Sequence, residues 1–127
     1  MSSKIPGGGG SPISKTDAAK MIEAYKTKRL KLIKETYGID DTQSVWFKRE
    51  VFEQMLKSNP NMDGIRIYFG VNYQGVMEGH QNVVLVGTTK VKEGMESSDG
   101  AQSEDDEGSI YDMGTPCPPA CSKGGIG

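Results

Sequence analysis

The sequence is poor in the residues that build reactive centres. Its 127 residues include only two cysteines, one histidine and one tryptophan. A structural zinc site usually takes four thiolate or imidazole ligands, so these residue types alone cannot complete such a site within one chain. No stretch approaches 18 consecutive apolar residues, and the N-terminus has no apolar segment of the signal-peptide type. We therefore expect no membrane insertion and predict cytoplasmic residence.

The sequence also lacks the strong positive charge that is typical of nucleic-acid binding. Its net charge is −2, with about +4 on residues 1–57 and about −6 on residues 58–127. We expect no nucleic-acid partner. Hydrophobic residues make up 35% of the chain, which limits the core to a small one. Small cores give marginal stability, so we expect a protein partner or a homo-oligomer.

Two helices are predicted in the first half of the chain. Apolar residues recur at helical spacing after Ser14 and Thr16, either of which is a suitable N-cap, and before Gly38, which is a suitable left-handed stop. A second helix is predicted over Val45–Ser58, with Trp46 packing its first turn against the core. Pro60 cannot continue that helix.

Two strands are predicted after the helices. Apolar and polar residues alternate over Ile65–Val71, and the start of Val83–Thr89 is continuously apolar. The sequence thus predicts an α+β fold, in which two helices pack on a small antiparallel sheet formed by this hairpin. Two strands alone make a poor sheet, so we expect the helices, a further strand from Ile110–Met113 or a second copy of the chain to complete it.

The predicted organisation has four parts. Residues 1–13, with four consecutive glycines, form a flexible lead, and residues 14–91 form one compact α+β domain. Residues 92–108 carry seven acidic side chains and few apolar ones, which is typical of a mobile acidic loop. Residues 109–127 form a tail, rich in cysteine and proline, that packs on the domain or on a partner.

The two cysteines leave three states open. A metal site could combine Cys117, Cys121 and His80, closed by Asp112, or share four thiolates between two copies. A disulfide would close a five-residue ring, although a reducing cytoplasm opposes it. A reduced turn, stiffened by the two prolines, would offer a rigid contact surface.

No complete catalytic set is apparent. Glu78 lies two residues from His80, and this pair could polarise a water molecule, yet no sequence feature places a substrate beside it. The run of four acidic residues at 104–107 lacks the spacing of a calcium-binding loop. We therefore expect neither enzymatic activity nor an obligatory cofactor, with zinc as the alternative at the cysteines.

Three segments together carry a resemblance. They are GIRIYFG at 64–70, NVVLVGTT at 82–89 and YDMGTPCPPAC at 111–121, and the pair Trp46-Phe47 precedes them. Over roughly residues 44–121 the chain resembles a group of small, uncharacterised bacterial proteins of the Bacteroidetes type. The resemblance implies that the strand pair and the cysteine tail belong to one unit. It implies no substrate, cofactor or catalytic residue.

These observations favour a non-catalytic interaction or assembly protein whose contact surface is the strand pair and the tail. The alternative is a metal-binding or redox-responsive protein that acts through Cys117 and Cys121, completed in a dimer. The residues predicted to contact the partner are Trp46, Arg66, Tyr68, Tyr111, Pro118 and Pro119.

Overall fold

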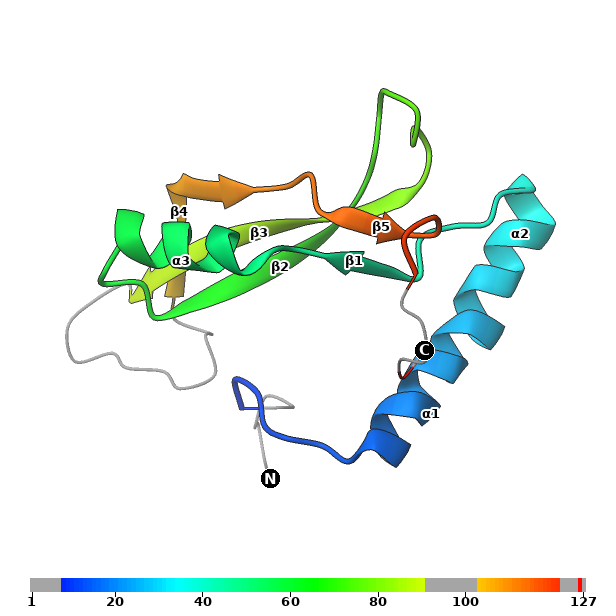
Figure 1. Ribbon diagram of the computed structural model, residues 1–127, viewed down its shortest axis with the longest axis horizontal. Helices are drawn as coiled ribbons and strands as arrows, with labels where there is room; N and C mark the ends of the chain where they lie inside the picture. The colour runs from blue at the N-terminus through cyan, green and yellow to red at the C-terminus, as the bar shows by residue number, and fades with distance from the viewer. Residues whose placement is uncertain (1–7, 91–102, 122–125, 127) are drawn as a thin grey trace. The chain divides into compact units, whose positions relative to one another are not determined.

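The computed structural model describes residues 8–90, 103–121 and 126. Over these residues the fold is α+β, with two helices and antiparallel sheets of two and three strands, which confirms the predicted class (Figure 1). Of the predicted flexible lead, residues 1–7 lie outside the described residues, and residues 8–13 contain no helix or strand.

The chain divides into two compact units that interleave along the sequence. Of the described residues, the first unit contains 8–12, 49–68, 84–90 and 103–111, and the second contains 13–48, 69–83, 112–121 and 126. Two of the strands contribute residues to both units. Strand pairing thus joins segments that are distant in sequence, and the compact domain expected over residues 14–91 stays a prediction.

The N-terminal helix belongs to the second unit and is continuous over three parts. These are α1 (Lys15–Tyr25), the π-helical segment η1 (Lys26–Leu30) and α2 (Lys31–Tyr37). The Ser14 hydroxyl accepts a hydrogen bond of 3.0 Å from the Asp17 amide at its start. Gly38 ends it in the left-handed conformation, with φ of 73°. The prediction of this helix and of its end at Gly38 is confirmed, and of the two caps that the sequence offers, Ser14 and Thr16, the structure uses Ser14.

A two-stranded antiparallel sheet also lies in the second unit. Strand β1 (Ser44–Trp46) pairs with β5 (Thr115–Cys117), and Val45 lies opposite Pro116. The prediction of a helix over Val45–Ser58 is therefore wrong at its start, because Val45 and Trp46 are in a strand. Val and Trp fit a pleated strand well, and the partner strand that decides between the two structures lies about 70 residues away.

The first unit contains the other helix, α3 (Arg49–Ser58), which buries Met55. It also contains most of a three-stranded sheet of order β2-β3-β4, made of β2 (Gly64–Val71), β3 (Gln81–Lys90) and β4 (Ser103–Tyr111). Both predicted strands of the hairpin are confirmed. Leu85–Thr88 of the central strand β3 are buried, whereas Val83 and Val84, at the start of the predicted apolar run, are half-buried.

Strand β4 corrects the prediction of an acidic loop. The loop was expected over residues 92–108, but residues 103–108 form the first part of β4, and residues 92–102 lie outside the described residues. The carboxylates of this strand have partners from distant segments. Asp106 accepts a hydrogen bond of 2.8 Å from the Asn59 side chain, and Asp105 pairs with Arg66. Such partners cannot be read from local composition.

Candidate functional site

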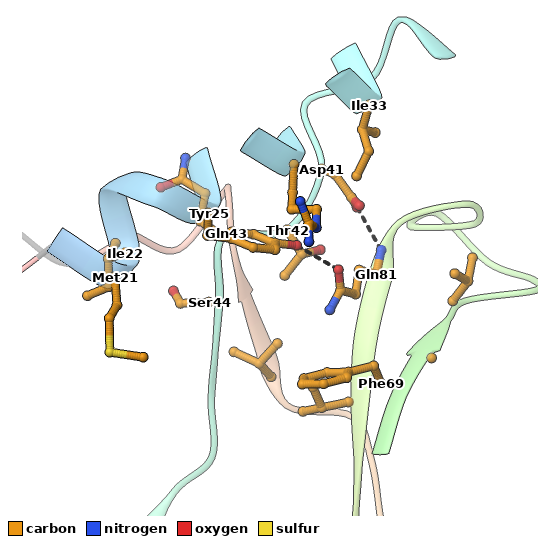
Figure 2. A pocket seen from close by; sticks show the side chains of 15 residues that line it. Met21, Ile22, Tyr25, Ile33, Asp41, Thr42, Gln43, Ser44, Phe69 and Gln81 are labelled. Carbon is orange, nitrogen blue, oxygen red and sulfur yellow. Dashed lines mark hydrogen bonds between the residues drawn. The ribbon is translucent and has the colours of Figure 1, made fainter. Parts of the chain in front are cut away.

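A large open cavity lies within the second unit and has a volume of roughly 830 Å³ (Figure 2). Its walls come from the N-terminal helix, from residues 41–45 and from the part of the hairpin that belongs to this unit. The lining is mainly apolar. Its main apolar members are Met21, Ile22, Ile33, Val45, Phe69, Val71 and Val83.

A chain of polar groups crosses one part of this cavity. The Tyr25 hydroxyl donates a hydrogen bond of 2.7 Å to Oε1 of Gln81, and the backbone amide of Gln81 donates one of 2.7 Å to Oδ1 of Asp41 (Figure 2). Burial raises the pKa of Tyr25, and the Asp41 charge raises it further, while Arg29 opposes both. The helix, residues 41–45 and the hairpin thus meet through hydrogen bonds at this point.

Two buried polar residues in the cavity wall have few partners. Asp41 is only 7% exposed, and among the described residues it forms no ion pair and accepts the single hydrogen bond from Gln81. The neighbouring Thr42 hydroxyl is buried and has no hydrogen-bond partner among the described residues. Burying a carboxylate with little compensation is costly, so Asp41 is a candidate ligand-binding group.

The two cysteines form a disulfide in the tail of the same unit. Cys117 and Cys121 have Cα atoms 4.6 Å apart. The turn is held to β1, since the Gln43 amide donates a hydrogen bond of 2.6 Å to the Cys117 carbonyl. Of the three states that the sequence left open, the structure has the disulfide. In this state neither sulfur is a thiolate, and no group of three or more potential metal ligands occurs among the described residues.

His80 lies at the end of the hairpin loop, where its backbone is well bonded. Its amide donates to the Met77 carbonyl at 3.0 Å, and its carbonyl accepts from the Asn72 amide at 2.9 Å. Nδ1 of its ring is buried and has no partner among the described residues. Glu78 is exposed and forms no hydrogen bond with His80. The two residues therefore do not form an oriented acid–base pair.

The six predicted contact residues do not gather in one unit. Trp46, Pro118 and Pro119 belong to the second unit, and Arg66, Tyr68 and Tyr111 belong to the first. Trp46 and Pro119 are exposed, while Tyr111 and Pro118 are half-buried. The sequence predicts that Trp46 packs the start of a helix. In the structure Trp46 lies in strand β1 instead.

Arg66 and Tyr68 already have a partner within the first unit. Both hydrogen-bond the carboxylate of Asp105, and Arg66 also forms an ion pair with it. The sequence gives no signal for this cluster, because its members are 37 to 39 residues apart.

Sequence reasoning missed a set of exposed apolar residues in the hairpin. Phe69, Val71, Tyr73 and Val76 are 79%, 65%, 83% and 100% exposed, and all belong to the second unit. We call these four residues the hairpin surface. The alternating strand pattern placed Phe69 and Val71 on one face, and only the structure shows that this face is uncovered here. Val76, an apolar residue directly after Gly75 in a loop, was the available signal.

Comparisons with known protein families, with curated proteins and with solved structures found no match for this chain. Among the described residues, no helix has both the length and the apolar character needed to cross a bilayer.

Proposed function

We propose that this chain is a non-catalytic protein-binding module that contacts its partner through the hairpin surface. The observation that carries this proposal is the exposure of four large apolar side chains, two of them aromatic, within eight residues of chain. Soluble monomers rarely expose contiguous apolar patches unless these serve in binding, and aromatic residues dominate the energy of protein interfaces.

The position of β2 supports the same proposal. It lies at one end of the order β2-β3-β4, so within the described part of the chain one side of its backbone has no neighbouring strand in that sheet. An open strand edge offers unpaired amide and carbonyl groups to an incoming strand. The proposed partner is either another protein or a second copy of this chain.

Substitution of the two aromatic residues tests the proposal. The variant Phe69→Ser with Tyr73→Ser removes the anchors, and Tyr37→Ser is the matched control, because Tyr37 is also exposed but lies on α2. Loss of an interface aromatic typically costs about 2 kcal/mol or more, so we expect the association constant to fall about 30-fold or more. Sedimentation velocity over a concentration series measures self-association, and affinity capture measures binding of other proteins.

Equal association of the wild-type chain and the double variant, or wild-type protein that stays monomeric and captures no protein, would contradict the proposal. Equal loss in the Tyr37→Ser control would show that the effect is not specific to the hairpin surface.

The disulfide favours a second candidate function, in which binding responds to redox state. Disulfides persist in oxidising compartments and are reduced in most cytosols, so the cytoplasmic residence expected from the sequence stays a prediction. Thiol counting before and after reduction tests this function. Metal analysis of the reduced chain tests the zinc alternative, for which one zinc ion per two chains is the expected ratio.

A further inference from the structure

We propose that the cavity of the second unit binds a small hydrophobic amine, with the ammonium group against the carboxylate of Asp41 and the apolar part against the helix and the hairpin. This inference goes beyond the proposed function, because the ligand is a small molecule and the site includes the charge of Asp41. Phe69 and Val71 belong both to the hairpin surface and to the cavity wall, so Tyr73, which does not line the cavity, separates the two proposals.

The size and the lining of the cavity suit such a ligand. Pockets for small molecules usually measure about 300–1,000 Å³ and combine an apolar lining with a few placed polar groups. The cavity lies within that range, and its walls include Ile22, Phe69 and Val83. An aliphatic or aromatic ligand body gains free energy by leaving water for these side chains.

The charge of the head group follows from Asp41. Asp41 is only 7% exposed, so folding has already removed most of the hydration of this residue. A ligand ammonium would supply charge-assisted hydrogen bonds to a carboxylate that accepts a single one from the residues that the structure describes. Only the ligand's own hydration is then lost on binding, whereas a newly buried ion pair must dehydrate both partners.

An anionic head group fits less well, although Arg29 also lines the cavity. Arg29 is exposed, and solvent and salt weaken the attraction between an exposed charge and a ligand. Asp41 is buried, where the local dielectric is lower and the same Coulomb interaction is stronger. A carboxylate ligand would therefore meet a weak attraction from Arg29 and a stronger repulsion from Asp41.

Calorimetric titration of the full chain with three probes of equal chain length tests the head group. The probes are n-octylamine, n-octanoate and n-octanol at neutral pH and below the concentrations at which they aggregate. We expect the amine to bind about tenfold or more tightly than the alcohol, as a charge-assisted hydrogen bond implies, and the carboxylate to bind most weakly. Octanoate binding as tightly as octylamine, octanol binding as tightly as octylamine, or no binding of the amine would overturn the proposal.

Variants locate the site. Asp41→Asn keeps an oxygen that can accept from the Gln81 amide but removes the charge, and we expect it to weaken amine binding about tenfold or more. Asp40→Asn is the matched control, because Asp40 is exposed, pairs with Lys34 at 3.3 Å and does not line the cavity. It should leave the affinity unchanged. If Asp41→Asn fails to fold, Ile22→Trp, which fills the cavity from the helix, should abolish amine binding.

Amine binding that survives the folded Asp41→Asn variant, or that survives Ile22→Trp, would contradict the site. The hairpin variant Tyr73→Ser separates this inference from the proposed function, because Tyr73 does not line the cavity. We expect it to weaken protein association and to leave amine affinity unchanged.

Discussion

Gly114 shows how a single residue permits the small sheet of the second unit. It directly precedes β5, and a Cβ atom added there would lie 2.7 Å from the ring of Phe47 and would also clash with Val45. Contacts below 3.0 Å force neighbouring groups to move, and here the neighbours are a β-branched side chain and an aromatic ring. The close approach of this segment to β1 therefore requires glycine.

We predict that Gly114→Ala lowers the free energy of unfolding by about 1–3 kcal/mol, the usual cost of overpacking. Urea denaturation followed by fluorescence measures it well, because Trp46, the only tryptophan, lies in β1 and pairs with Thr115. Gly108→Ala is the control, since the nearest atom to its added Cβ is the Asp106 side chain at 3.4 Å. Equal stability of the two variants would show that the close approach is not required.

At the scale of elements, a side-chain cluster joins strands that are not neighbours in the sheet. Arg66 and Tyr68 of β2 both bond Asp105 of β4, although β3 lies between these strands in the sheet order. A second set supports the same ends of the strands, because Asp63 accepts from the hydroxyls of Ser103 and Thr88. These bonds hold the acidic segment 103–108 in the sheet. The composition of that segment alone predicts a loop.

The cluster predicts a loss of stability in acid. The Tyr68 hydrogen bond, followed by Arg66, lowers the pKa of Asp105, and hydrogen bonds from Ser103 and Thr88 lower the pKa of Asp63. The folded-state pKa of each of these two carboxyl groups thus lies below its unfolded value of about 4. The stability that their hydrogen bonds contribute is therefore fully present above that pH. It is lost as the pH falls through the folded-state pKa.

We therefore expect the urea midpoint of the wild-type chain to fall below about pH 4. Asp105→Asn should lower the midpoint at neutral pH and reduce its dependence on acid. Glu104→Gln is the matched control from the same strand, because the Glu104 side chain has no hydrogen bond or ion pair among the described residues. A wild-type midpoint that stays level between pH 7 and pH 2, or an equal effect of both variants, would contradict the role of the cluster.

At the scale of the molecule, the buried apolar core is small. Among the described residues, its buried hydrophobic members are Met55, Leu85, Val86 and Cys117. Met55 is the largest fully buried side chain, and it comes from α3 of the first unit. A core of this size agrees with the low hydrophobic content of the sequence. It also supports the proposal that the exposed apolar residues bind a partner.

We predict that Met55→Ala lowers the free energy of unfolding by about 2–5 kcal/mol, because it removes buried contacts and leaves a cavity. For a small domain this is a large part of the total stability. Leu56→Ala is the matched control, since Leu56 is the next residue of α3 and is 53% exposed. Circular dichroism during thermal unfolding measures both, and a Met55→Ala variant as stable as Leu56→Ala would refute this account of the core.

Sequence patterns within each segment were sufficient to predict the N-terminal helix and the strands β2 and β3. The N-terminal helix follows from a serine cap, an apolar period and a glycine stop, and β2 and β3 follow from alternation and from a continuous apolar run. The α+β class rests on these elements. The resemblance to small bacterial proteins and the function that was expected with it stay predictions.

Long-range partners decided the rest. Val45 and Trp46 are strand residues because β5 pairs with them, and residues 103–108 are strand residues because β3 pairs with them and Arg66 binds Asp105. The cavity beside Asp41 exists only where the helix, residues 41–45 and the hairpin meet. Composition and periodicity describe a residue and its near neighbours, whereas burial and pairing depend on segments that the folded chain brings together.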